Sequence, residues 1–526
     1  MNLLIFHVSA ILEMTESSLS AEEKYFLIRL CYWYECSAGG NLKRVVEKTI
    51  EELEVILGMS DNLIKKTRDS LIAKNYLTQC RVPSHSVTGK GRPRAGFALS
   101  DVAINKIRFL NHHRIHPNHI RRIERLLLWK HSTSGGQLKQ QEIANLTPSN
   151  RILLAVLYSH ASSTGMVNDL GVMRLAKLSG LLTKDRTETQ LVKLTKLGYF
   201  LDRVSGMTGK YIFGMSNGAF FLNIFMDQNK DKKSALLLLM SKKLYRNRDY
   251  GHSQNWPIDK IFTENVNPAI RAKNSESLEN PSNKDAIEKL KLELMCIEND
   301  FLERSVFDKI SWIKEGDDFP YCSWASFISD EADFWISRFS KKVWWLGLLF
   351  EGVGAFHHRK LLQHKINYYA SVLLTEHWDD VTQNFSLINP CLNRLKQDLF
   401  PTHIKRKVIT DFECYIPHEG FGDILMDAAL VCFYRMVFET ALLSKGLIEW
   451  MCKDLKVDLS NATYTILSVG YKMGKPIENV SIVAKFRDDK LPCSFIDLTI
   501  SPSRVCDLLE HENLNIEKLV GRGFSL

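Results

Sequence analysis

The feature that most constrains the fold is a pair of segments that share one arrangement of helix-ending signals. Residues 71–77 read LIAKNYL and residues 194–200 read LTKLGYF, each with a small or polar residue before an aromatic one. Asn75 and Gly198 tolerate the left-handed backbone that ends a helix, so each segment predicts a helix followed at once by a strand. The repeat predicts two helix-turn-helix modules, each with a short strand hairpin.

A glycine turn and a capping residue precede the closing helix in both copies. Gly58 and Ser60 stand in the first copy, and Gly180 and Thr183 in the second. A Ser or Thr oxygen at this position accepts a hydrogen bond from an amide that the first helical turn leaves unpaired. Both closing helices are therefore expected to begin just after these residues.

The other elements of the first module follow from the same kinds of signal. A helix is expected from Ser20, where Glu23 completes a capping box, and a second helix near residues 49–57. The strands of the hairpin are expected at residues 76–82 and 96–99, joined by a long basic loop.

The second module is expected to start at Thr147, a cap that is followed by proline. Its hairpin strands are placed at residues 200–205 and 210–215, with the turn at 206–209. A basic helix from about Lys232 to Arg248 is expected to follow.

Composition sets the outer limits. At 526 residues, with 45% hydrophobic and 25% charged residues, the chain can form three or more domains with real cores. Eleven cysteines without a CxxC pair fit a reducing compartment, and the apolar runs are shorter than the roughly 20 residues of a membrane span. A cytoplasmic protein without membrane contact and without a cofactor is expected.

Beyond the modules the character of the chain changes. Residues 251–283 are rich in Asn, Ser and Pro and predict a linker, and seven of the ten tryptophans follow it. Helices are expected at residues 286–307, 335–350, 360–374, 422–443 and 505–510, and strands at 463–471, 480–486 and 494–500. An aromatic-rich, mildly acidic α+β domain favours a protein-binding surface.

Positive charge is concentrated in the part of the chain that holds the two modules. The net charge of +9 divides into +15 for residues 1–280 and −6 for residues 281–526, and residues 61–250 alone carry +20. This asymmetry is typical of a face that binds a polyanion. A solvated basic surface without a partner is the alternative.

The two closing helices offer side chains suited to DNA. In the first, Ile64, Thr67 and Leu71 are expected to face inward, and in the second the inward residues are leucines. Amide and basic side chains read base edges in the major groove, and Thr and Lys also contact phosphates. The expected contacts are Asn62, Lys65 and Lys66 in the first helix, and Arg186, Thr189, Gln190 and Lys193 in the second. Asp69 and Glu188 would repel phosphate, so ordinary polar faces remain the alternative.

The loop of the first hairpin carries the most specific short motif. Lys90-Gly91-Arg92-Pro93-Arg94 resembles the core of an AT-hook. Proline keeps such a segment extended, glycine allows close approach, and the arginines favour the negative potential of a narrow A·T-rich minor groove. Lys90, Arg92 and Arg94 are therefore expected to contact a minor groove, although an incidental basic loop would look the same.

Further basic residues are expected to extend this surface. Four histidines fall within residues 111–119, but no Cys or carboxylate with ligand spacing accompanies them, so a zinc site is the weaker interpretation. With Arg121 and Arg122 they are expected to contact phosphates between the modules. Lys210, in the second hairpin, is expected to contact DNA as well.

No catalytic motif appears in the sequence. Phosphate-binding loops, dinucleotide fingerprints, His-Glu-x-x-His and nucleophile elbows are all missing, which favours a protein without catalytic activity. The C-terminal part offers one acidic cluster that could hold a divalent metal for phosphodiester hydrolysis. It comprises Asp411, Glu413, Glu419, Asp423 and Asp427, with His418 nearby.

Residues 20–215 resemble tandem winged-helix DNA-binding proteins, and the arrangement is similar to plasmid-type replication initiators and to some regulators of mobile elements. The resemblance covers about two fifths of the chain. It implies binding to repeated or pseudo-palindromic DNA sites and, in some members, recruitment of replication proteins. This chain departs from the pattern because it continues far beyond the second module.

The sequence as a whole predicts a mainly α fold with small β wings. Five segments are expected: a first winged-helix domain (1–110), a basic connector (111–146), a second winged-helix domain with a basic helix (147–250), a linker (251–283) and a C-terminal helical or α+β domain (284–526). The expected function is non-catalytic binding of double-stranded DNA, with a protein partner or a second copy bound by residues 284–526. The alternatives are an assembly subunit whose winged helices dock proteins, and a DNA-binding nuclease.

Overall fold

The computed structural model forms two compact units. Unit 1 contains Met1–Phe200 with Leu222–Asp227, and unit 2 contains Leu201–Phe221 with Gln228–Leu526. The residues that the structure describes are 3–15, 19–37, 40–82, 94–109, 115–128, 146–168, 170–224, 235–241, 356–382, 385–415, 421–452, 458–467, 471–472, 475–476, 479–486 and 494–497. In these residues the fold is mainly helical with small, largely antiparallel sheets, which agrees with the coarse fold class predicted above.

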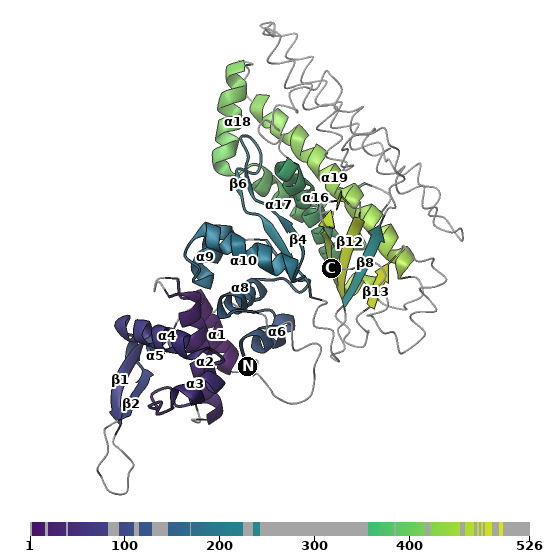
Figure 1. The fold of residues 1–526 in the computed structure, drawn as a ribbon. Coiled ribbons are helices and arrows are strands. Elements are labelled where there is room, and N and C mark those ends of the chain that lie inside the picture. The colour runs from purple at the N-terminus through teal and green to yellow at the C-terminus, as the bar shows by residue number, and fades with distance from the viewer. Residues whose placement is uncertain are drawn as a thin grey trace, which may run out of the picture. The chain divides into compact units, whose positions relative to one another are not determined.

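The first module lies in unit 1 (Figure 1). Its elements are α2 (Ala21–Ser37), α3 (Ile50–Leu57), α4 (Asp61–Ala73), β1 (Leu77–Val82) and β2 (Arg94–Leu99). β1 and β2 pair antiparallel along their whole length. Val46, just before α3, forms a single antiparallel bridge with Phe97, so that β2 has a partner on each edge.

The helix ends of the first module follow the predicted signals, with one exception. Ser20 and Glu23 form the expected capping box, and Gly58 ends α3 in the left-handed conformation with φ of 64°. Asn75 likewise has φ of 60° after α4. Ser60 occupies the N-cap of α4, but its side chain makes no capping hydrogen bond. The Asp61 amide at this end instead donates to the Glu54 carboxylate, a longer-range partner that residue spacing does not reveal.

The second module has the same order of helices, with a short strand after its first helix and a longer hairpin. It comprises α8 (Pro148–Ser159), β3 (Met166–Val167), α9 (Val172–Ser179), α10 (Lys184–Lys196), β4 (Phe200–Val204), β5 (Met207–Thr208), β6 (Met215–Ser216) and β7 (Ala219–Leu222). The sheet order is β3-β7-β4. Leu222 N–H donates to Gly165 O, and Asn223 N–H donates to Tyr199 O.

The second hairpin is longer than predicted. Residues 210–215 were expected to form its return strand, but they lie mainly in the turn, where Gly209 N–H donates to Gly214 O. β5 and β6 pair on either side of this turn, and the chain returns to the sheet only at β7. The Gly206-Met207-Thr208-Gly209 signal was therefore assigned to the wrong position, because Met207 and Thr208 belong to a strand.

Three further helices join the two modules within unit 1. They are α1 (Leu3–Glu13), α5 (Asp101–Phe109) and α6 (Pro117–Leu128). α2 packs against α8 and α6, and α6 packs against α8, so helices of both modules share one core. The buried Lys24 ammonium donates to Leu12 O at 2.9 Å and to Leu178 O at 2.8 Å, which links α1, α2 and α9.

This shared core explains why α2 is buried on nearly every side. Lys24 and Arg29 of α2 are 0% exposed alongside its apolar residues. Arg29 donates to Ile56 O and Leu127 O, because a buried guanidinium needs acceptors in place of water. The helices of the two modules therefore share one core in unit 1, whereas residues 201–221 of the second hairpin belong to unit 2.

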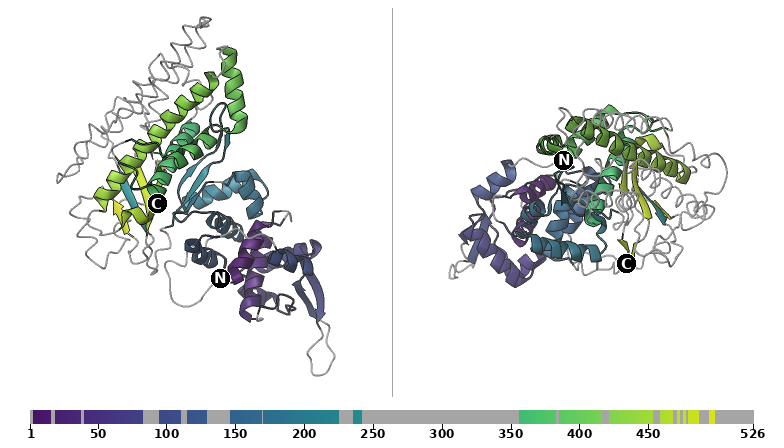
Figure 2. Two further views of the ribbon diagram at one scale, coloured as in Figure 1. Left: turned by 180° about the vertical axis from the view of Figure 1, so that it is seen from behind. Right: turned by 90° about the horizontal axis from the view of Figure 1, so that it is seen from above.

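Unit 2 combines helices with a four-stranded sheet. Its helices are α16 (Phe356–Glu376), α17 (Asn389–Leu399), α18 (Thr402–Tyr415), α19 (Phe421–Met451) and the short η5 (Leu459–Asn461). Its strands are β8 (Ala235–Ser241), β9 (Ala462–Leu467), β10 (Tyr471–Lys472), β11 (Lys475–Pro476), β12 (Asn479–Phe486) and β13 (Ser494–Asp497). The sheet order is β13-β8-β12-β9, and α16 packs against both α19 and β9 (Figure 2).

The prediction of a basic helix from Lys232 to Arg248 is wrong where the structure describes it. Residues 235–241 form β8, which pairs antiparallel with β12 and parallel with β13. A short apolar run of this length suits a buried strand as well as a helix, and distant pairing partners decide between them. The C-terminal sheet thus includes a strand from before the predicted linker.

The other predictions for the C-terminal part agree better with the structure. The helices expected at 360–374 and 422–443 correspond to α16 and α19, and the three expected strands correspond to β9, β12 and β13. The linker at 251–283 and the helices expected at 286–307, 335–350 and 505–510 lie outside the described residues. Among the described helices, none is long and apolar enough to span a membrane.

Candidate nucleic-acid interface

The exposed face of the second helix-turn-helix is strongly basic. α9 and α10 together carry six lysines and arginines and only two acidic residues. The six are all exposed: Arg174, Lys177, Lys184, Arg186, Lys193 and Lys196. The sequence analysis predicted Arg186 and Lys193 as contacts. It did not predict the other four, although Arg174 and Lys177 have the spacing of residues on one helical face.

The corresponding face of the first module has the opposite balance. α3 and α4 carry five acidic residues and three basic ones. Lys65 pairs with Asp61 at 2.9 Å, and Arg68 pairs with Asp69 at 2.9 Å. Both pairs are largely exposed, so water and salt screen them. The α3–α4 pair and the α9–α10 pair therefore differ in electrostatic character.

The predicted contact residues of α4 lie where the sequence placed them. Asn62, Lys65 and Lys66 are exposed, while Ile64, Thr67 and Leu71 are buried. At the other end of the helix, Ser70 and Lys74 both bind the Glu23 carboxylate of α2, at distances of 2.6 and 2.7 Å. This contact fixes the end of α4 that leads into the hairpin.

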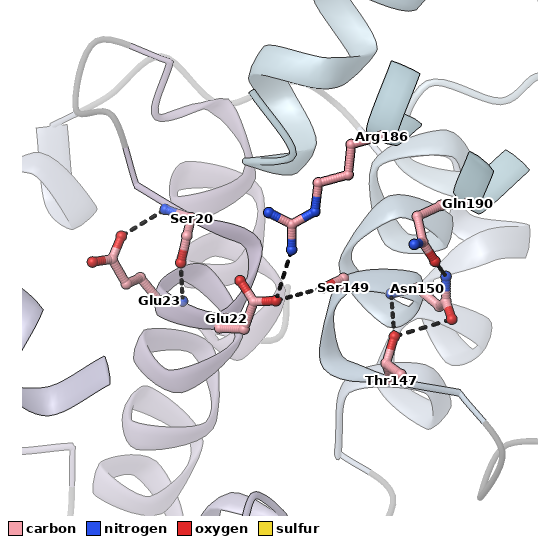
Figure 3. Close-up of polar contacts among 8 residues, drawn as sticks. All are labelled: Ser20, Glu22, Glu23, Thr147, Ser149, Asn150, Arg186 and Gln190. Carbon is pink, nitrogen blue, oxygen red and sulfur yellow. Dashed lines mark hydrogen bonds and ion pairs between the residues drawn. The ribbon is translucent and has the colours of Figure 1, made fainter. Parts of the chain in front are cut away.

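Arg186 lies at the junction of the two modules. Its Nη2 is 3.5 Å from Oε1 of Glu22 on α2, and the same oxygen accepts a hydrogen bond from the Ser149 hydroxyl at 2.6 Å (Figure 3). The Arg186 side chain is nonetheless 51% exposed. One edge of the guanidinium therefore meets the first module while the rest of the group remains open to solvent.

Gln190 is held in a different way. The side-chain Nδ2 of Asn150 donates to Gln190 Oε1 at 2.5 Å, and Asn150 Oδ1 in turn accepts from the Thr147 hydroxyl (Figure 3). Thr147 caps α8 as predicted, because its side chain accepts a hydrogen bond from the backbone N–H of Asn150. Gln190 is half-buried, so its oxygen is occupied within the protein and its amino group is the part suited to donate to a base.

The two remaining positions of α10 are open. Thr189 and Lys193 are exposed, and the Thr189 hydroxyl donates to Asp185 O one turn earlier. Leu191 and Leu194 face the core as predicted, whereas Leu197 is half-buried. The outward residues of α10 thus include basic and hydroxyl groups together with the exposed Asp185 and Val192.

The loop of the first hairpin falls largely outside the described residues. Lys90 and Arg92 lie there, and the structure describes Arg94 only by its backbone at the start of β2. In that position Arg94 pairs with Val82 across the hairpin. The described strands therefore place the AT-hook-like segment in the connection between β1 and β2, where the sequence predicted it.

The connector supports the predicted surface only in part. Arg121 is exposed, but Arg122 is 8% exposed and donates to Asn118 O and Ile224 O. His119 is fully buried, and its Nε2 donates to Ser162 O at 2.6 Å. Burial lowers the pKa of His119 to about 4.

The predictions that Arg122 and His119 contact phosphate are therefore wrong. Both residues satisfy backbone carbonyls where α6 meets α8 and the end of the second hairpin. Runs of basic residues reveal nothing about which members face a neighbouring helix. His112 and His113 lie outside the described residues.

Lys210 lies in the part of the second hairpin that belongs to unit 2. It is half-buried, and its ammonium lies 4.7 Å from the centroid of the Tyr211 ring. Tyr211 itself is buried and donates its hydroxyl hydrogen to Asp411 of α18 at 3.0 Å. The hairpin tip is thus packed within unit 2 and does not project freely, as a DNA-binding wing does.

The proposed acidic cluster does not assemble among the side chains that the structure describes. Asp411 binds Tyr211, Asp423 pairs with Lys405 at 3.3 Å, and Asp427 pairs with Lys396 at 2.9 Å. The described part of the chain contains no group of three potential metal ligands. The side chains of Glu413, His418 and Glu419 lie outside the described residues.

Comparisons with known proteins identify no relative: no family model, curated protein or solved structure matches the chain. Function must therefore be argued from the site itself.

Proposed function

We propose that the chain is a non-catalytic, double-stranded DNA-binding protein built on two winged helices. Both modules contain a first helix, two further helices and a β-hairpin in that order, with a bridge at Val46 or the short strand β3 after the first helix, and this order supports the interpretation. In such modules the last helix enters the major groove and the hairpin contacts the adjacent backbone or minor groove. The resemblance to plasmid-type replication initiators and mobile-element regulators remains part of the proposal.

The observation that carries the proposal is the basic face of α9 and α10. Six exposed cations against two acidic residues create a local positive potential over one helix-turn-helix. Phosphate contacts provide most of the affinity in protein–DNA complexes, and such a face supplies them. The second module is therefore proposed as the principal DNA reader, with Arg186, Thr189 and Lys193 as its contacts.

The first module is proposed to act mainly through its hairpin. Its α3 and α4 carry excess acidic charge, which disfavours deep insertion beside phosphates. The basic connection between β1 and β2 has the charge and the extended Gly-Arg-Pro sequence that suit a minor groove. Residues 284–526 are proposed to bind a protein partner or a second copy of the chain.

Glu22 is proposed to orient Arg186 for base reading. A carboxylate that holds one edge of a guanidinium reduces the number of side-chain conformations lost on binding. Replacing Glu22 with Gln keeps an acceptor for Ser149 but removes the charge next to Arg186. We expect this variant to discriminate less between its preferred duplex and unrelated sequences.

The experiment is a duplex-selection assay with the full chain, followed by affinity measurements on selected and unrelated DNA. Arg186→Ala should lower the preference by about 1–3 kcal/mol at one base position. Lys396→Ala, an exposed lysine on α17, is the matched control and should leave the preference unchanged. Equal preferences in native protein and Arg186→Ala would refute base reading by α10.

The assembly-subunit hypothesis retains one supporting observation. The acidic α3 and α4 face could dock a basic protein instead of DNA. Duplex binding that does not depend on salt, together with binding of a basic protein to this face, would favour it.

A further inference from the structure

The tip of the second hairpin is anchored by helices of unit 2. Phe213 N–H donates to Leu399 O at 2.8 Å, at the end of α17. Gly214 has φ of +51°, and a Cβ at this position would lie 2.8 Å from Nε2 of His403 on α18. Tyr211, Phe213 and Gly214 are buried. The tip is therefore held against α17 and α18 over several consecutive residues.

This packing brings cations from two distant segments to one aromatic ring. The Lys210 ammonium lies 4.7 Å from the centroid of the Tyr211 ring, and the Lys407 ammonium of α18 lies 5.7 Å from it. Both distances are within the range of a cation–π contact. Both cations therefore lie beside the same ring.

The neighbouring residues of α18 add to this charge. Lys405, Arg406 and Lys407 are consecutive and exposed. Lys405 has a carboxylate partner, Asp423, at 3.3 Å. No described carboxylate lies within ion-pair distance of Arg406 or Lys407. Arg406 and Lys407, exposed and without a described carboxylate partner, are suited to an anion from outside the chain.

We propose that Lys210, Arg406 and Lys407 form a second DNA-contact surface that binds the phosphate backbone of a duplex. It is called the hairpin–α18 surface below. The proposal rests on the proposed function, because duplex DNA is the polyanion that the basic face of α9 and α10 is inferred to bind. The surface consists of one half-buried and two exposed cations, and its contacts are with phosphates and carry no sequence preference.

The geometry also assigns a role to the second hairpin. A wing usually approaches DNA with its tip, but here the tip residues form the base of a surface to which α18 contributes most of the cations. The hairpin–α18 surface therefore replaces the isolated wing as the backbone contact of this part of the chain.

The test uses the full chain with Arg406 and Lys407 both changed to Ala. Binding to one duplex is measured across a salt series, and thermal melting confirms that the variant is folded. Each lost phosphate contact reduces the slope of log K against log salt by about 0.9, so we expect a reduction of about 1.8. Affinity should fall by the same factor for selected and unrelated duplexes.

Lys396→Ala is the matched control, because Lys396 is an exposed lysine on the neighbouring helix with its own partner, Asp427. It should leave the slope within error of the native value. An unchanged slope in the double variant, in a native protein that binds DNA steeply, would overturn the hairpin–α18 surface alone.

Two other results would lead to different conclusions. A native chain without salt-dependent duplex binding would overturn the proposed function and this surface with it. Loss of binding to poly-glutamate with an unchanged DNA slope would assign the surface to an acidic protein partner and overturn the DNA proposal for it.

Discussion

The stability of unit 1 should rise with pH because of one buried lysine. Lys24 is 0% exposed, and burial lowers the pKa of its ammonium from 10.5 to about 7, although Glu13 nearby acts in the opposite direction. In the unfolded chain the amine keeps its ordinary pKa. Between these two values the unfolded state therefore binds a proton that the native state has released.

The sign and size follow from this difference. Below pH 7 both states are protonated, and the native state pays a cost of about 5 kcal/mol for the buried charge, at about 1.4 kcal/mol per pKa unit. As pH rises from 7 toward 10.5 that cost disappears. Relative to a chain without the amine, the free energy of unfolding should increase by about 2 kcal/mol between pH 7 and pH 9.

The comparison is with Lys24→Met, which has similar volume and no titrating group. Urea unfolding at pH 7, 8 and 9 is followed by pulsed hydrogen exchange in α2 peptides, so that the transition of unit 1 is observed by itself. The difference between native and variant cancels the contributions of other titrating groups. Lys66→Met, at an exposed position of α4, is the control and should show no such trend.

A difference between native protein and Lys24→Met that stays constant from pH 7 to pH 9, or that changes in the opposite direction, would refute the reasoning. The loss of the hydrogen bonds to Leu12 O and Leu178 O shifts the difference at every pH but does not create a slope.

Two further substitutions test the packing. Gly180→Ala places a Cβ 2.5 Å from Leu19 O at a φ of +70°, so it should destabilise unit 1 by more than about 2 kcal/mol. Gly58→Ala has a similar φ of +64° but no atom closer than 3.7 Å, so it should cost only about 1 kcal/mol. Thermal melting of unit 1 compares the two variants, and equal losses of stability would contradict the close approach at Gly180. Lys360→Met leaves the buried Asp202 carboxylate without its cation and should destabilise unit 2 by about 3–5 kcal/mol. Adding Asp202→Asn removes the unpaired charge and should restore part of this stability. Urea unfolding measures both variants, and a double variant that is no more stable than Lys360→Met would contradict the ion pair.

Local signals predicted the helix ends well. Gly58, Gly180, Asn75 and Gly198 all adopt positive φ, as their positions after helices required. Such signals act within a few residues, so a single sequence is sufficient to reveal them. The hydrophobic spacing of α4 also identified its buried face, because that helix has one core side.

Long-range packing limited the rest. α2 is buried on most sides because α8 of the second module packs against it. Residues 235–241 became a strand because β12 and β13 flank them. The burial of α2 and the strand at residues 235–241 both depend on segments that are distant in sequence. The spacing of neighbouring residues therefore could not predict them.

The candidate site shows the same division. Exposed positions on α4 and α10 followed from helical spacing, whereas Arg122 was expected at the surface and is instead bonded to Ile224 O. The contacts of Glu22 with Arg186 and of Tyr211 with Asp411 join residues more than a hundred positions apart. Only the folded chain brings these groups together.

The measurement that tests the central claim most directly is the affinity of the full chain for duplex DNA between 50 and 200 mM salt, with A·T-rich and G·C-rich probes. The account predicts a fall of about 10³ to 10⁵ in affinity for roughly 6 to 10 phosphate contacts. It also predicts an A·T preference that disappears when Arg92 and Arg94 are both changed to Ala. Weak binding that is indifferent to salt and to these substitutions would contradict the account.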